Sequence, residues 1–137
     1  MTSEIAAPGT PASGRSNPLL ARMGCTQGGG GSQINALLTV IDVAAAGTAP
    51  GPSAVLATED AGCSPVRMAE SADRSTLWVA ARGDNSVLAF SPSRLETDPN
   101  NAPLGYVSRG GDAPVGIALF QDDELLAVAN SARFGGT

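Results

Sequence analysis

The chain has 137 residues, of which 42% are hydrophobic and 15% charged, and its formal net charge is −5. A chain of this size and composition holds one domain at most and can build a hydrophobic core. It contains no histidine, and all eight basic residues are arginines, which excludes within this chain a Ser-His-Asp triad, a His-ligated zinc or haem, and a lysine nucleophile. The acidic balance also argues against nucleic-acid binding, which needs clustered cations.

Residues 1–17 are small, polar and rich in Pro, Gly and Ser. They lack the basic start and the apolar run of a secretory signal. No apolar run approaches the roughly 18–20 residues of a membrane-spanning helix. We therefore expect a disordered tail, with a short targeting or docking arm as the alternative, and we expect no membrane span. Since nothing indicates secretion, a cytoplasmic location is the default.

Two cysteines, Cys25 and Cys63, lie 38 positions apart. This spacing fits neither a zinc site nor a C-x-x-C redox motif. A single disulfide and two independent thiols both remain open. The short acidic clusters of the chain lack the regular oxygen spacing of a calcium loop. We therefore predict no metal site and no cofactor.

An internal repeat with a period of 49 residues is present. Residues 62–66 (GCSPV) reappear as residues 111–115 (GDAPV), and residues 77–80 (LWVA) reappear as residues 126–129 (LAVA). Residues 38–42 (LTVID) match residues 87–91 (VLAFS) at the same shift. Aligning residues 36–88 with residues 85–137 requires no gap. The shared order of Gly, Pro, Asp and apolar segments favours a true repeat.

Each repeat consists of short apolar runs separated by turn residues. Runs of five to seven residues with Val, Leu, Trp and Phe are typical of strands. Asp73 lies in a turn, where its carboxylate can accept a bond from the backbone. Apolar residues occupy both alternating faces, which predicts strands buried on both sides, with Trp78 and Phe90 as core anchors. The predicted strands are residues 66–71, 76–82, 86–91 and 104–108, and residues 92–103 are predicted to be an insertion between outer strands.

A helical alternative applies to residues 37–46 and 124–130, which contain good helix formers. The repeat partner of residues 124–130 is residues 75–81, whose sequence STLWVAA favours a strand. Two copies of one repeat should share one structure, so strands are favoured. Four short strands in a repeat of about 40–50 residues match one blade of a β-propeller.

The order of these segments resembles the YVTN-type β-propeller repeat. The resemblance is carried by residues 62–66 (GCSPV), 77–81 (LWVAA) and 85–90 (NSVLAF), with Val128, Ala129 and Asn130 at the signature position of the second copy. That family includes seven-bladed lactonase-like and quinoprotein-like propellers. The resemblance implies an all-β fold of antiparallel, four-stranded blades, and it covers roughly residues 36–137.

Mapped onto that template, residues 18–137 form an incomplete propeller of about two blades. Residues 36–59 supply the end of one blade, residues 62–108 a full blade, and residues 112–131 the start of the next. Propellers close with roughly four to eight blades. We therefore expect a fragment of a longer propeller, or else one segment of an oligomeric ring. Open blade faces invite self-association.

Arg67 is the sharpest candidate for a binding residue. It starts the innermost strand of the full blade, from which a side chain can reach the central channel. Its guanidinium can clamp a carboxylate or a phosphate. The alternative is an ion pair with Glu70 or with an acidic neighbour in the adjacent blade. Glu70 is expected to be buried, which requires a partner. Strand alternation places its side chain on the other face of the strand from Arg67, so the partner is expected in a neighbouring blade.

The turns after the second strands carry the remaining candidates, which would line a pocket rim on one face of the propeller. Ordinary turn chemistry on a solvated surface is the alternative. These candidates are Arg82, Asp84, Asn85, Asn130 and Arg133.

The sequence best fits a non-catalytic binding or scaffold module for a protein or a small-molecule ligand. The alternative is a lactonase-like hydrolase of sugar or organic-acid lactones. In that enzyme Arg67 would stabilise the oxyanion and Glu70 would activate water. A redox propeller is implied by kinship alone.

Overall fold

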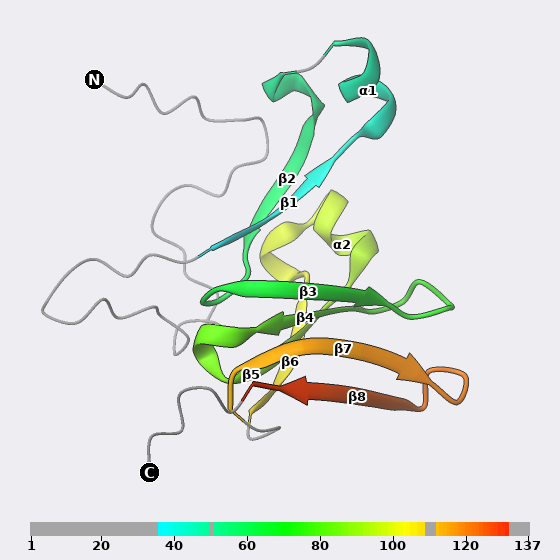
Figure 1. Ribbon diagram of the computed structural model, residues 1–137. Helices are drawn as coiled ribbons and strands as arrows, with labels where there is room; N and C mark the ends of the chain where they lie inside the picture. Colours follow the sequence, from blue (N-terminus) through cyan, green and yellow to red (C-terminus); the bar gives the residue numbers. More distant parts are fainter. Residues whose placement is uncertain (1–35, 50, 109–111, 132–137) are drawn as a thin grey trace, which may run out of the picture.

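The computed structural model describes residues 36–49, 51–108 and 112–131. Within these ranges, eight strands form three antiparallel sheets, accompanied by two six-residue α-helices and three short 3-10 helices (Figure 1). The predicted all-β, antiparallel architecture is confirmed. No described helix has the length and apolar character needed to cross a membrane.

The first sheet pairs β1 (Leu37–Ile41) with β2 (Val55–Asp60). The connection between them contains α1 (Val43–Thr48) and the 3-10 helix η1 (Pro52–Ala54). Asp42 caps α1, since its carboxylate accepts a bond of 2.9 Å from the Ala45 N–H. The helical alternative for residues 37–46 is therefore wrong for Leu37–Ile41, which form β1, and correct from Val43 onward.

The second sheet holds four strands in chain order. The turn between β3 (Pro65–Glu70) and β4 (Leu77–Ala81) is held by Asp73. Its carboxylate accepts bonds from the Ser75 N–H at 2.9 Å and from the Ser71 hydroxyl at 2.7 Å. These bonds lower the pKa of Asp73. The predicted insertion contains two helices. The elements are β3 (Pro65–Glu70), β4 (Leu77–Ala81), the 3-10 helix η2 (Arg82–Asp84), β5 (Ser86–Phe90), α2 (Pro92–Thr97), η3 (Pro99–Asn101) and β6 (Pro103–Ser108).

The third sheet pairs β7 (Pro114–Phe120) with β8 (Leu125–Asn130). The helical alternative for residues 124–130 is therefore wrong. β7 packs against β3 and β4, so the second and third sheets lie against each other (Figure 1). The β7–β8 turn also reaches the second sheet, because the Asp123 carboxylate accepts a bond from the Ala72 N–H.

The bounds of the elements recur with the period seen in the sequence. β5 follows β1 by 49 positions, α2 follows α1 by 49, and β7 starts 49 positions after β3. β6, however, follows β2 by only 48 positions, because the first copy has one more residue between its α-helix and its outer strand. The gap-free alignment is therefore wrong by one residue from this loop to the end of β2.

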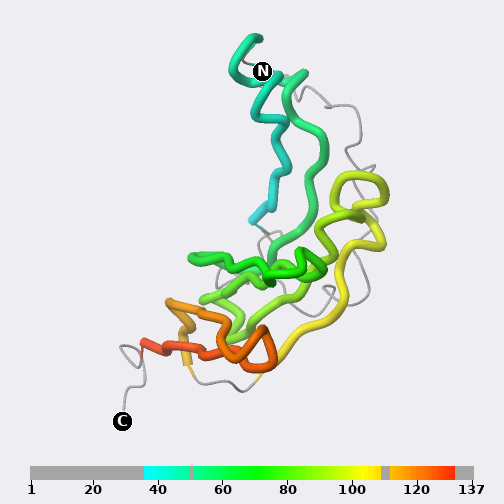
Figure 2. The backbone as a smooth tube through the Cα atoms, turned by 90° about the vertical axis from the view of Figure 1, so that its right-hand side faces the viewer, coloured from blue at the N-terminus to red at the C-terminus, as the bar shows by residue number. Residues whose placement is uncertain are grey.

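The main core lies between the first and second sheets. Leu38 of β1 joins Val79, Leu88 and Phe90 of the second sheet, with Leu95 of α2 at one side. Figure 2 shows β1 and β2 rising from the second sheet with α2 beside β2. Every residue of β5 is buried, so this strand is covered on both faces. β3 and β8 contain no buried residue, so the expectation that the strands are buried on both sides is wrong for them. Phe90 is fully buried, whereas Trp78 is half-buried and lies toward the third sheet.

Candidate functional site

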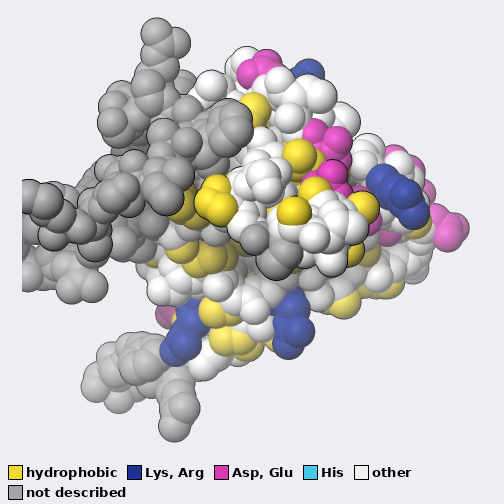
Figure 3. All heavy atoms as spheres, turned by 90° about the horizontal axis from the view of Figure 1, so that it is seen from above, with side chains coloured by type: hydrophobic (Ala, Val, Ile, Leu, Met, Phe, Trp, Pro, Cys, Tyr) yellow, Lys and Arg dark blue, Asp and Glu magenta, His cyan; other side chains and the backbone are white. Residues whose placement is uncertain are grey.

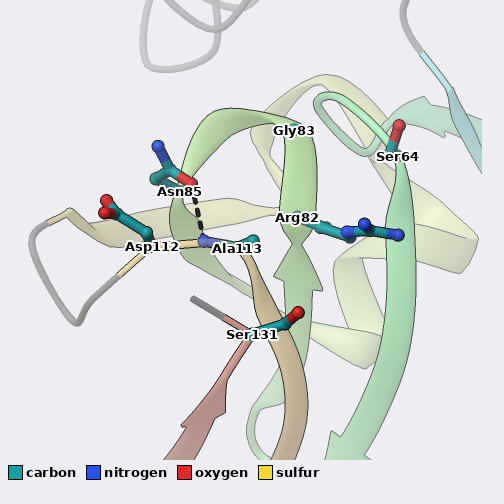
Figure 4. A pocket seen from close by; sticks show the side chains of 7 residues that line it. All are labelled: Ser64, Arg82, Gly83, Asn85, Asp112, Ala113 and Ser131. Carbon is teal, nitrogen blue, oxygen red and sulfur yellow. Dashed lines mark hydrogen bonds between the residues drawn. The ribbon is translucent and has the colours of Figure 1, made fainter. Parts of the chain in front are cut away.

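A cavity of about 420 Å³ opens where the turns of the second and third sheets meet (Figure 4). Three turns build it: the one before β3, the η2 turn after β4, and the one before β7. Residue 131, just after β8, closes the remaining side. The lining residues are Ser64, Arg82, Gly83, Asn85, Asp112, Ala113 and Ser131.

Asn85 joins the two sheets at this cavity. Its side-chain oxygen accepts a bond of 2.7 Å from the Ala113 N–H, drawn as the dashed line in Figure 4. Asn85 has a φ of 52°, a left-handed conformation that Asn tolerates better than most residues. Ala113 and its repeat partner Ser64 have φ values of 52° and 50°, so the same turn precedes β3 and β7.

Asp84 is used within the fold. Its carboxylate accepts a bond from the Cys63 N–H, and the Gly83 N–H donates to the Cys63 carbonyl at 2.9 Å. A Cβ on Gly62 would overlap the Asp84 carboxylate, and this glycine has a φ of 71°. The close approach explains why glycine occupies position 62. Asp84 therefore braces the turn before β3, as the turn-chemistry alternative predicted.

Cys63 is buried and forms a disulfide. The alternative of two independent thiols is therefore wrong. Cys25 is the only other cysteine in the sequence and lies outside the described residues. The Cys63 backbone supplies the N–H and the carbonyl that Asp84 and Gly83 contact beside the cavity.

The structure brings together only part of the predicted set. Arg82 and Asn85 line the cavity, and Asn130 lies in an adjoining apolar cleft that Asn85 also borders. Arg133 lies outside the described residues. Arg67 is exposed on β3 and lines a different cleft, between the first and second sheets.

The expectation for Glu70 is wrong. Glu70 is exposed at the end of β3, and no ion pair of this carboxylate is present among the described parts of the chain. The register pairs Glu70 with Leu77 and Arg67 with Ala80, so the two side chains point to opposite faces, as alternation predicted. At the end of β3, no described strand covers Glu70, and the burial that would require a partner does not arise.

Sequence reasoning missed five of the seven lining residues, one of which is Gly83 in the η2 turn. Ser64, Asp112, Ala113 and Ser131 flank strands in two different sheets. The repeat held a usable signal, because Ser64 and Ala113 occupy equivalent positions 49 residues apart. Recognising that these turns meet the η2 turn requires the packing of one sheet on the next.

The cavity combines one cation, one carboxylate, an amide and two hydroxyls. Figure 4 shows the Arg82 side chain crossing toward β3, which begins just after Ser64, while the Asp112 carboxylate points away from Arg82. The arrangement suits hydrogen bonding to a small polar ligand. Within the described ranges, no group of three or more metal-ligating side chains occurs.

Glu59 is an unexpected buried carboxyl. It lies on β2 opposite Leu38 and is only 6% exposed. Burial raises the pKa of Glu59 to about 7, and the charge of neighbouring Asp60 acts in the same direction. Nothing in the local sequence distinguished this glutamate from Asp60, because its burial depends on the second sheet.

We compared the chain with models of protein families, with curated proteins and with solved structures, and no match was found in any of the three comparisons. The YVTN-type resemblance therefore rests on the residues quoted above.

Proposed function

We propose that this chain is a segment of a YVTN-like β-propeller that acts as a non-catalytic binding or scaffold module. The observation that carries the proposal is the cavity between the second and third sheets, built in part by equivalent turns 49 residues apart. Sheets that follow one another face to face, with strands in chain order, are the arrangement of propeller blades. In propellers, turns on one face of neighbouring blades provide binding surfaces.

The ligand that this cavity fits is small and polar, with a negatively charged group for Arg82. Asn85 is already engaged with Ala113, so it sets the shape of the cavity and leaves its amide nitrogen for a ligand. The hydroxyls of Ser64 and Ser131 can donate or accept. A sugar acid, with one carboxylate and several hydroxyls, matches these groups.

The lactonase alternative is less well supported. Its two proposed residues, Arg67 and Glu70, point to opposite faces of β3 and cannot converge on one carbonyl. Arg67 also lies in a cleft separate from the cavity. The redox alternative rests on kinship and gains no support from the lining residues.

Titration of the ¹⁵N-labelled chain with gluconate, succinate and glucono-δ-lactone tests the proposal. We expect saturable amide shifts at Gly83, Asn85 and Ala113. Arg82→Gln should remove them, as should Ser131→Leu, which fills the cavity but keeps the bond of the Ser131 N–H to the Ala113 carbonyl. A lack of saturable shifts with all three compounds would refute the ligand class.

Arg94→Gln is the matched control. Arg94 is an exposed arginine on α2, where it contacts the Asn101 carbonyl at 3.2 Å. This variant removes the same charge away from the cavity and should bind normally. Acid release from the lactone, followed in the same samples, tests the alternative. Turnover that Arg67→Ala abolishes would favour the hydrolase over the binding module.

The disulfide at Cys63 bears on location. Stable disulfides are typical of oxidising compartments. We therefore propose an oxidising compartment in place of the cytoplasmic default.

A further inference from the structure

Two sheet edges in this molecule are complementary. Among the described residues, β8 pairs only with β7, and β1 pairs only with β2. In the second sheet, the strand equivalent to β8 is β4 and the strand equivalent to β1 is β5, and these two strands pair with each other. Within the described ranges, β8 therefore has no neighbour of the β5 kind, and β1 has no neighbour of the β4 kind.

We propose that a second copy of the chain pairs with these two strands. Its β1–β2 pair adds to the edge of β8, so that two half-sheets from two copies form one four-stranded sheet with the order of the second sheet. The inference uses the repeat architecture of the proposed function, and it makes no use of ligand binding at the cavity.

The complete sheet specifies the register of this contact. Leu77 pairs with Phe90, and Val79 pairs with Leu88. Applying the 49-residue period, Leu126 of one copy faces Ile41 of the second, and Val128 faces Thr39 of the second. A shift by one residue would move every side chain to the opposite face.

One face of the composite sheet fills an existing cleft. A mostly apolar cleft of about 180 Å³ separates the second and third sheets, lined in part by Trp78, Val87 and Val128. The register places Leu37 and Ile41 of the second copy on the face that borders this cleft. These two side chains are 61% and 51% exposed within one copy. The contact therefore removes apolar surface from water on both sides.

The other face of the composite sheet fits a second cleft, of about 510 Å³, beside β1 and β3. Phe120 and Leu125 pair across the third sheet and are 47% and 45% exposed. Assembly carries this pair toward the cleft of the second copy, where Met68 is 56% exposed. One contact thus covers exposed apolar groups at both ends of the molecule. On the face shown in Figure 3, hydrophobic side chains are scattered, with charged groups between them.

The composition of the two edges supports a strand as the occupant. Natural edge strands are usually protected by charged residues or proline. β1 (LLTVI) and β8 (LLAVAN) contain neither. By contrast, the outermost strands of the first and second sheets carry such residues, with Asp60 on β2 and with proline at the start of β6.

The contact joins different surfaces of the two copies, so it propagates until it closes. Each copy brings eight described strands, equivalent to two four-stranded sheets. Propellers close with about four to eight blades. The assembly is therefore a closed ring of two to four copies.

Light scattering coupled to size exclusion, with circular dichroism on the same peak, tests this on the full chain. We expect a discrete species of two to four copies with a β-sheet spectrum. A folded monomer would overturn the proposal, because the edges would then be covered by other residues of the same chain. A polydisperse aggregate or an unfolded monomer would overturn it as well.

Cysteine cross-linking tests the register. Thr39→Cys with Val128→Cys places two thiols at directly facing positions of different copies, and oxidation should give a ladder of covalent oligomers. The matched control is Thr39→Cys with Ala127→Cys, which moves one thiol to the opposite face. We expect at least a tenfold difference in cross-linked yield, and equal yields would refute the register.

Titration of gluconate into Thr39→Glu, expected to be monomeric, separates this inference from ligand binding, because the cavity lies within one copy.

Discussion

Replacing Glu59 with glutamine should make the protein more stable at neutral and alkaline pH. Glu59 is almost fully buried on β2, and its pKa rises from 4.5 to about 7 on folding. The folded state therefore holds a proton that the unfolded state has already released between these pH values. One pKa unit corresponds to about 1.36 kcal/mol, so this group costs the wild type up to about 3 kcal/mol above pH 7.

The sign follows from the direction of the pKa change. Because folding raises the pKa of Glu59, the favourable contribution of its protonated carboxyl to the free energy of unfolding is fully present below pH 4.5. This contribution is lost as the pH rises to about 7. Glu59→Gln keeps the shape of the side chain but has no charge to bury. We expect the two proteins to differ little at pH 4.5, and the variant to be more stable by up to about 3 kcal/mol at pH 8.

Urea unfolding followed by circular dichroism at pH 4.5, 6, 7 and 8 measures this difference. Protein concentration must be held constant, because assembly would stabilise the folded state by mass action. Glu96→Gln is the control, since Glu96 is an exposed glutamate on α2. A variant with the same pH slope as the wild type, or one that is less stable at pH 8, would refute the reasoning.

Three further predictions concern the links between sheets. Asn85→Ala should lower the free energy of unfolding by about 1–2 kcal/mol, because it leaves the buried Ala113 N–H unpaired. Asn85→Gly keeps the left-handed turn, so a loss of similar size there would assign the effect to the bond, and no loss in either variant would contradict it. Phe90→Ala should cost about 3–5 kcal/mol in urea unfolding, since Phe90 is fully buried, and Phe120→Ala should instead weaken self-association in light scattering. Thiol titration of the denatured chain should find no free Cys63 before reduction and two thiols after it.

The strands were predictable from the sequence because their signals are local. β5 (Ser86–Phe90) and β3 (Pro65–Glu70) agree with the predicted runs to within one residue at each end. Short apolar runs bounded by Gly, Asp and Asn restrict the backbone wherever they occur. Asp73 likewise holds its turn with partners two residues away on either side.

The two short helices show a limit of the same approach. Residues 92–103 contain a proline at the first helical position of α2 and a further proline at the start of η3. Both are helix-start signals. Because α2 and η3 are short, their sequences show little hydrophobic periodicity, and the sequence predicts only an insertion here.

The site depended on tertiary structure. Asn85 and Ala113 are 28 positions apart, and the bond between them forms only because β7 packs on β3 and β4. Glu59 and Glu70 are both glutamates on strands, yet the second sheet covers Glu59, whereas no described strand covers Glu70. The sequence alone determined where strands and turns form, because backbone preferences act between near neighbours. Packing between sheets decided which polar groups are buried, bonded or exposed, because solvent exclusion depends on surfaces far apart in the chain.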